Sequence, residues 1–258
     1  SYSVTGVQTC ALPISYLSEI GMRVNRCKIH LMVYKPHLDI PDYYSRFASP
    51  ICDMDCGLIC RQYNLSGKPF CCDICVAVPV ALKEEWTYLK SNTQLWHKLR
   101  GDECPQDPID LPKMQAETPA YMHLMACKGP AFCERDFRTL SCRQFPFSPY
   151  ITADDRLIGL TYNWDFEEVC WVISNLDRVS DRYRKEFLDI YDNLLFEHPS
   201  EYDSYYWLSE DMREHFVKIC RQIPILHRDG GFYLLDPHSD KMTRSEEHTS
   251  ELQSPNTI

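Results

Sequence analysis

The residues of this chain that are best suited to chemistry are its cysteines. Fourteen are present, and ten of them fall into two runs, residues 52–75 and residues 127–170. The first run has the spacing C-x3-C-x3-C-x10-C-C-x2-C, and the second has C-x5-C-x8-C followed by a distant cysteine. Cysteine thiolates are soft ligands that suit zinc, copper(I) and iron–sulfur clusters. The two runs therefore predict a module that binds a metal ion or a cluster.

Nine of these ten cysteines are predicted to ligate the metal, and the tenth, Cys75, ranks below them. A structural zinc ion or a single iron–sulfur cluster takes four thiolates, so nine ligands predict either two sites or one larger cluster. Cys71 and Cys72 point opposite ways in an extended chain, so they serve different metals or only one of them binds. The predicted metal ligands are Cys52, Cys56, Cys60, Cys71, Cys72, Cys127, Cys133, Cys142 and Cys170.

The sequence around these cysteines resembles the zinc- or iron-chelating cysteine-cluster family, which is known by its CxxCxxCC signature. The resemblance covers roughly residues 50 to 175, and the upstream cysteines depart from it because three residues separate them instead of two. It implies metal chelation without an assigned reaction, and an iron–sulfur-dependent enzyme for redox or protein methyl-transfer chemistry is the alternative. The matching features are the pair Cys71-Cys72, Val78-Pro79-Val80-Ala81-Leu82, Cys127-Lys128-Gly129, Cys133, Cys142-Arg143-Gln144-Phe145-Pro146-Phe147 and the lone Cys170.

The remaining thiols and two arginines receive other assignments. Cys104 lies in a polar, proline-rich stretch and is predicted to be a surface thiol, whereas Cys220 is predicted to pack on the apolar face of a helix. Arg143 and Arg135 are predicted either to offset the negative charge of the thiolates or to be solvated surface side chains. The histidines are scattered along the chain without ligand spacing, so they are not predicted ligands.

Charge and hydropathy restrict the partners. The formal net charge of −10 disfavours nucleic acid and anionic membranes, and no apolar run approaches the ~20 residues of a membrane span. The predicted partner is the metal ion or cluster itself, and no protein partner is identified. Without an export signal the expected location is the reducing cytoplasm, where cysteine clusters are more often metal sites than disulfides. A disulfide-stapled, exported interaction domain is the second alternative.

The two ends of the chain resemble translated sequencing-adapter DNA. Residues 4–14 and 244–254 correspond to one adapter read on opposite strands, so neither segment is expected to contribute to the fold. Met32 is a candidate start, which makes Cys27 as well as Cys10 foreign to the protein. The predicted organisation is adapter-derived residues 1–15, an uncertain leader 16–35, a cysteine-cluster metal-binding domain 36–175, a helical pair and final hairpin 176–243, and adapter-derived residues 244–258.

The elements that must position the cysteines follow from hydrophobic periodicity and turn residues. The predicted fold is α+β, mostly helical, with two short β-hairpins around a cysteine-ligated metal site. Leu95 and Leu99 are expected to continue a helix, and a short helix ending at Val172 is expected to carry Cys170. The other expectations are a hairpin of residues 148–152 and 156–164, an antiparallel helix pair of residues 180–196 and 200–220, a loop over residues 101–118, and a final hairpin of residues 223–226 and 232–235.

Overall fold

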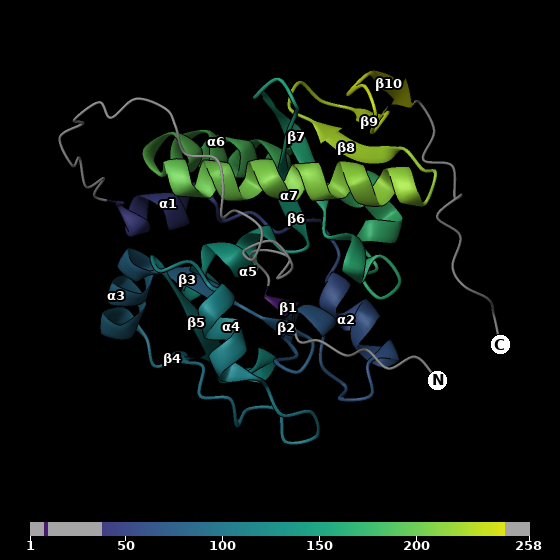
Figure 1. The fold of residues 1–258 in the computed structure, drawn as a ribbon. Coiled ribbons are helices and arrows are strands. Elements are labelled where there is room, and N and C mark those ends of the chain that lie inside the picture. The colour runs from purple at the N-terminus through teal and green to yellow at the C-terminus, as the bar shows by residue number, and fades with distance from the viewer. Residues whose placement is uncertain (1–7, 10–37, 246–258) are drawn as a thin grey trace.

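The computed structural model describes residues 8–9 and 38–245 (Figure 1). The expectations for the leader 16–35, with Cys27 and Met32, lie outside the described residues, as do those for most of the two adapter-like ends, including Cys10. Within the described ranges, no helix is long and apolar enough to cross a membrane.

Two antiparallel β-sheets form the framework. Both predicted hairpins exist, but they join edge to edge through β7 and β8 and extend into one five-stranded sheet of order β10-β9-β8-β7-β6. Its strands are β6 (Phe147–Ile151), β7 (Leu157–Tyr162), β8 (Ile223–His227), β9 (Phe232–Leu235) and β10 (Met242–Ser245). A second sheet of order β3-β5-β4 contains β3 (Val80–Leu82), β4 (Trp96–Lys98) and β5 (Met122–Cys127). A short parallel pair joins β1 (Gln8–Thr9) to β2 (Ala77–Val78).

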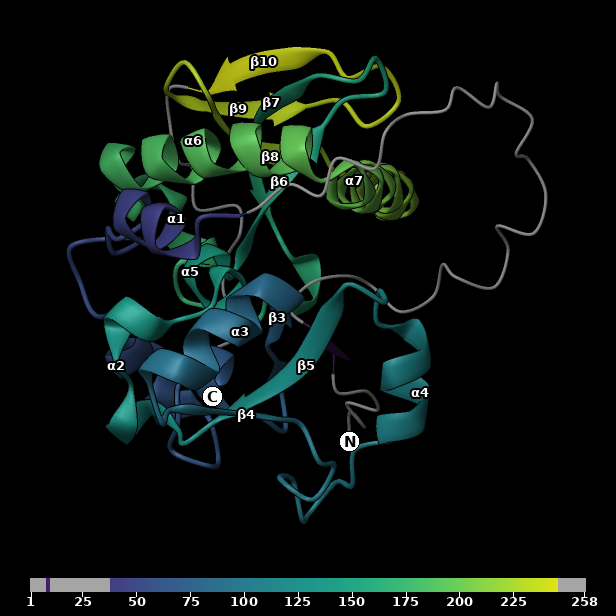
Figure 2. The same ribbon diagram turned by 90° about the vertical axis from the view of Figure 1, so that its left-hand side faces the viewer.

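The two long helices lie between the five-stranded sheet and the rest of the molecule (Figure 2). They are α6 (Asp181–Glu197) and α7 (Pro199–Lys218), so the predicted helices are confirmed. Ser180 caps α6 by accepting a hydrogen bond from the backbone N–H of Tyr183. Figure 2 looks along the axis of α7 while α6 lies across the view, so the two helices cross steeply and the predicted antiparallel pairing is wrong.

Short helices and turns make up the cysteine-rich part of the chain. Local capping accounts for several of them, since Asp39, Asp55, Asp110 and Thr139 each accept a backbone N–H in the first turn of the helix that follows. The α-helices are α1 (Ile40–Arg46), α2 (Cys56–Cys60), α3 (Lys83–Asn92), α4 (Leu111–Glu117) and α5 (Leu140–Gln144). The 3-10 turns are η2 (Arg61–Tyr63), η3 (Phe70–Cys72), η4 (Pro130–Phe132), η5 (Arg135–Phe137), η6 (Trp164–Phe166) and η7 (Ile173–Arg178).

The predicted fold, mostly helical with two short hairpins around a cysteine-ligated metal site, is wrong. The hairpins belong to a five-stranded sheet, and the three-stranded sheet was not anticipated. Among the described residues, no three Cys, His, Asp or Glu side chains are placed to hold a metal ion together. The hydrophobic pattern reports which face of an element is buried, but it does not report the distant strand that completes a sheet.

Three local predictions also fail because tertiary contacts override local preference. The stretch between Leu95 and Leu99 is strand β4 and not helix, because it pairs with β5. The expected loop 101–118 contains helix α4, which Asp110 caps. Cys170 lies after the turn η6, where its backbone N–H donates to the Phe166 carbonyl, and it is not in a helix.

Buried aromatic side chains on α6 connect the halves of the molecule. The predicted apolar stripe of this helix is fully buried. The Tyr183 ring lies 5.4 Å from the Phe47 ring, beyond α1, and 6.0 Å from the Phe147 ring of β6. The Phe187 ring stacks on the Tyr191 ring at 4.5 Å between centroids. The cysteine-rich segments therefore rest on a rigid packed core.

Candidate metal centre

The structure places the nine predicted ligands on short elements and on the turns between them. None of the nine forms a disulfide, and none is exposed. Their positions are Cys52 before α2, Cys56 and Cys60 at the two ends of α2, Cys71 and Cys72 in η3, Cys127 at the end of β5, Cys133 after η4, Cys142 in α5 and Cys170 after η6.

Four of these thiols form a first group around α2. Burial, with smaller contributions from the neighbouring thiols of Cys52, Cys170 and Cys60, raises the pKa of Cys56 to about 12. Burial also raises the pKa of Cys170 to about 12, with smaller contributions from Cys60 and Cys52. Cys52, Cys56, Cys60 and Cys170 therefore lie within electrostatic range of one another, and we name them the α2 group.

A second group surrounds the Arg138 side chain. The Nε atom of Arg138 donates to the Cys133 Sγ at 3.0 Å. Burial lowers the pKa of Arg138, but its interactions with Cys133, Cys142 and Cys72 outweigh burial and raise it. Cys127 interacts in turn with Cys72 and Cys133. Cys72, Cys127, Cys133 and Cys142 form what we name the Arg138 group.

The vicinal pair joins the two groups. The two sulfur atoms lie 3.8 Å apart in the turn η3. The hydrogen bond between them raises the pKa of Cys71 and lowers that of Cys72, and the charge of Arg138 lowers the Cys72 pKa as well. Cys71 interacts with Cys170 and Cys56 of the α2 group. The expectation that the pair points opposite ways is wrong, because η3 is a turn and not extended chain.

The gathered thiols do not form a finished coordination sphere. The structure brings all nine into one electrostatic network, yet within residues 8–9 and 38–245 no three potential ligands are in position to share a metal ion. Closer approach of the sulfur atoms is required before either group could coordinate a metal at Zn–S distances of about 2.3 Å.

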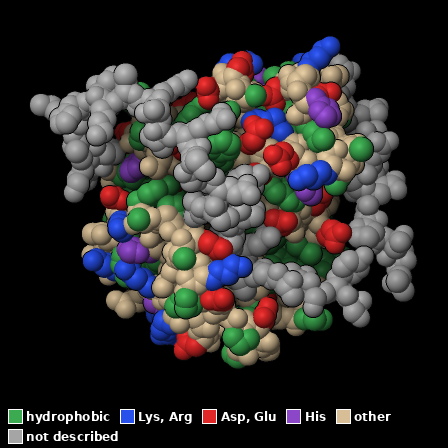
Figure 3. Space-filling model, viewed as in Figure 1, with side chains coloured by type: hydrophobic (Ala, Val, Ile, Leu, Met, Phe, Trp, Pro, Cys, Tyr) green, Lys and Arg blue, Asp and Glu red, His purple; other side chains and the backbone are tan. Residues whose placement is uncertain are grey.

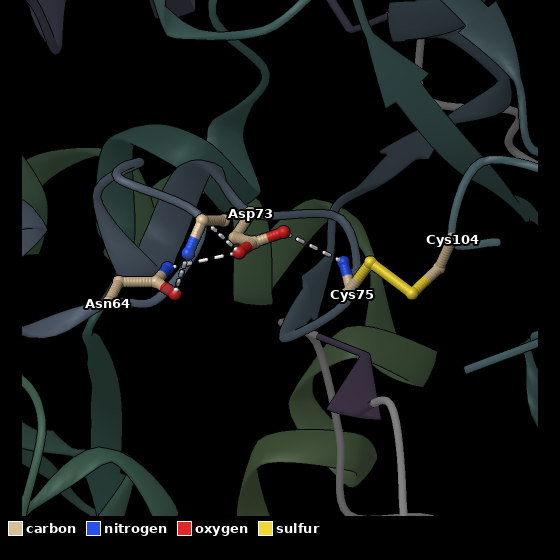
Figure 4. The surroundings of a disulfide bond; sticks show 5 residues. Asn64, Asp73, Cys75 and Cys104 are labelled. Carbon is tan, nitrogen blue, oxygen red and sulfur yellow. Dashed lines mark hydrogen bonds between the residues drawn. A yellow bond between two sulfur atoms is a disulfide. The ribbon is translucent and has the colours of Figure 1, made fainter. Parts of the chain in front are cut away.

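Two cysteines outside the network form a disulfide bond (Figure 4). Cys75 and Cys104 are bonded across a sequence separation of 29 residues, with their Cα atoms 5.3 Å apart. Cys104 is 1% exposed, so its prediction as a surface thiol is wrong. Asp73 anchors the Cys75 side of the bond: its carboxylate accepts the Cys75 backbone N–H at 3.2 Å and the Asn64 amide at 3.0 Å.

Two further assignments change in the structure. Cys220 is exposed, because it takes a left-handed conformation (φ 54°) where the chain leaves α7, so its predicted packing on the helix is wrong. Arg143 is bound to the backbone in the structure. Its guanidinium donates to the backbone carbonyls of Tyr44, Phe47, Arg135, Asp136 and Arg138.

Arg138 is the charged residue of the site that sequence reasoning missed. The signal available was its place between Cys133 and Cys142, which Arg135 shares. Arg135 is exposed, which agrees with the alternative that it is a solvated surface side chain. Spacing alone did not distinguish the two arginines, because the turn η5 decides which of them faces the thiols.

No protein-family model, curated protein or solved structure matches the chain. The resemblance to the cysteine-cluster family therefore rests on the motif residues themselves.

Proposed function

We propose that this protein binds iron, as an iron–sulfur cluster, or zinc, through thiolates of the α2 group and the Arg138 group. One observation carries the proposal. The nine cysteines selected from sequence spacing form a continuous electrostatic network, whereas the other three cysteines of residues 38–245 lie in a disulfide or on the surface. Soft thiolates gathered in this number suit zinc or iron–sulfur clusters.

The groups suggest two sites of four ligands. The α2 group and the Arg138 group each supply four thiols, which is the number that closes a structural zinc site or holds one cluster. Cys71 interacts with thiols of both groups, so it could serve as a ligand in either site. Iron is favoured slightly over zinc because the ligands exceed a single tetrahedral site.

Binding would couple to proton release and to local folding. Burial raises the pKa of Cys56, Cys170 and Cys127, so these thiols are protonated at neutral pH without a metal. A bound cation displaces such protons and draws the sulfur atoms together. The short helix α2 and the turns η3 and η4 are the elements that would close on the metal.

The cytoplasm is the compartment that suits this function, because nine thiols that form no disulfide persist best in a reducing environment. On the face seen in Figure 3, acidic and basic side chains are interspersed. The expectation of no nucleic-acid and no membrane partner stays a prediction. The Cys75–Cys104 bond is the one observation that favours the alternative of a disulfide-stapled domain, and it involves only these two cysteines.

Anaerobic purification of the full chain, followed by metal and labile-sulfide analysis and a visible spectrum, tests the proposal. Brown protein with iron and sulfide supports a cluster, and colourless protein with stoichiometric zinc supports a structural site. Metal-free protein that also takes up neither metal on reconstitution would overturn the proposal. A gain of more than two thiols on reduction would support the disulfide alternative instead, since the described bond accounts for two.

Matched cysteine variants locate the ligands. Cys142→Ser is expected to lose metal, because Cys142 belongs to the Arg138 group. Cys220→Ser is the control, because Cys220 is exposed and outside both groups. Equal metal content in the two variants would contradict the ligand assignment.

A further inference from the structure

A second polar site lies inside the molecule, between the three-stranded sheet and helices α6 and α7. It is a small, partly open cavity with room for at least one water-sized group. Two glutamates, Glu85 of α3 and Glu201 of α7, face it from opposite elements. Leu82, Met122 and Leu194 supply apolar walls. None of the nine predicted metal ligands lines it, so the inference does not depend on metal binding.

Glu85 is held in place by three hydrogen bonds. Its Oε1 atom accepts the Tyr44 hydroxyl at 2.7 Å and the Leu140 backbone N–H at 2.6 Å, and Oε2 accepts the Leu82 backbone N–H at 3.2 Å. The residue is 1% exposed. These donors fix the orientation of the carboxylate, and Oε2 keeps capacity for a further hydrogen bond.

Glu201 differs, because one of its carboxylate oxygens is unsatisfied. The residue is 2% exposed, and its Oε1 atom has no hydrogen-bond partner within the described part of the chain. The Tyr121 hydroxyl interacts with the carboxylate, and Glu85 lies within electrostatic range. A buried acceptor without a donor costs free energy, so the site is built for a donor that the protein itself does not supply.

We propose that this cavity binds a primary ammonium group carried on a short alkyl stem. Two facing carboxylates create negative potential, which a cation neutralises and a water molecule does not. An ammonium group has N–H donors for Glu201 Oε1 and Glu85 Oε2, and the Tyr205 ring lines the same space. The walls of Leu82, Met122 and Leu194 suit the stem. A metal ion fits less well, because only two of the residues that line the cavity, Glu85 and Glu201, carry a carboxylate.

Calorimetric titration of the full chain with methylammonium chloride, at constant ionic strength, tests the proposal. At pH 8 a primary amine is still protonated, while Glu201 and Glu85, whose pKa values burial raises to about 7, are both mostly ionised. We expect saturable binding at one site, no binding of tetramethylammonium, which has no N–H, and no saturable response to potassium chloride. Absence of saturation by methylammonium, or an equal response to the potassium salt, would overturn the proposal.

A matched pair of variants assigns the signal to the cavity. Glu201→Gln keeps the shape of the side chain but removes its charge, so methylammonium affinity should fall about tenfold or more. Glu214→Gln on the same helix is the control. Glu214 is exposed and forms a surface ion pair with Lys218 at 3.5 Å, away from the cavity lining. The Glu214→Gln variant should bind methylammonium with the same affinity as the unaltered protein. A Glu201→Gln variant that melts normally and binds methylammonium as tightly as the control would also overturn the proposal.

Discussion

The Nε atom of Arg138 lies 3.0 Å from the Sγ atom of Cys133, which places a half-buried guanidinium directly against a predicted metal ligand. The same cation interacts with Cys142 and Cys72, two more members of the Arg138 group. A fixed positive charge among several thiols stabilises their ionised forms. Metal sites with excess thiolate charge gain from such a neighbour, because outer contacts orient the ligands and tune the metal.

Replacing Arg138 by methionine, which retains the apolar stem, should weaken metal binding by about tenfold or more, as removal of outer-shell partners commonly does. Competition with a chelator of known affinity measures the change. Arg156→Met serves as control, because Arg156 is exposed and pairs with Asp154 far from the thiols in sequence. If both variants hold the metal equally well, Arg138 has no part in the site.

The Cys75–Cys104 bond should contribute to stability independently of any metal. A cross-link that closes a loop of 29 residues removes unfolded-state entropy, which the loop-closure relation equates with about 3 to 4 kcal/mol. Cys75→Ser and Cys104→Ser should therefore each lower the free energy of unfolding by a similar amount in urea titrations of the metal-free protein. The double variant should lose no more than either single variant, and additive losses would show that the two side chains act separately.

Local sequence patterns were sufficient for the elements whose partners are close in the chain. Helix α6 carries a stripe of period 3.6 and a Ser180 cap, and each predicted hairpin has a short turn between alternating strands. The three-stranded sheet was missed because β5 pairs with β3 and β4 across intervening residues. Residues 122–127 form a short apolar run, and such a run does not distinguish a strand from a buried helix.

The candidate site divides in the same way. Spacing selected nine cysteines whose charges interact in the structure, but no three of them are placed to share a metal ion within the described residues, so their role as ligands stays a prediction. It did not select the pairing of Cys75 with Cys104, since connectivity across a long loop cannot be read from sequence. Glu85 and Glu201 are separated by more than a hundred residues and meet only where α3 and α7 both line the cavity, so no local pattern pointed to it.

The Arg143 side chain should be required for stability and not for metal binding. Its planar guanidinium donates to five backbone carbonyls and stacks on the Tyr44 ring at 4.3 Å. Lysine has one nitrogen and cannot reach this set, so Arg143→Lys should cost about 2 to 3 kcal/mol of unfolding free energy. Arg135→Lys is the matched control, because Arg135 is exposed. Equal free energies of unfolding for the two variants would show that the hydrogen bonds of Arg143 do not stabilise the fold.

Glu201 should make the stability of the protein depend on pH. Burial raises its pKa from 4.5 to about 7, with a smaller contribution from the nearby Glu85 carboxylate and an opposing one from the Tyr121 hydroxyl. Because the folded state holds the proton more tightly than the unfolded state, the stability is highest in acid. It should fall from about pH 4.5 to pH 7 and then level off, with a total loss for this group of about 3 kcal/mol.

Glu201→Gln removes that titration and isolates it from the other groups. The variant should gain about 2 to 3 kcal/mol relative to the unaltered protein between pH 5 and pH 8, because the variant has no charge to bury at the higher pH. Urea unfolding at a series of pH values measures the difference, and Glu214→Gln, exposed on the same helix, should show none. A pH-independent gap between Glu201→Gln and the unaltered protein would mean that the folded state ionises Glu201 as readily as the unfolded chain does.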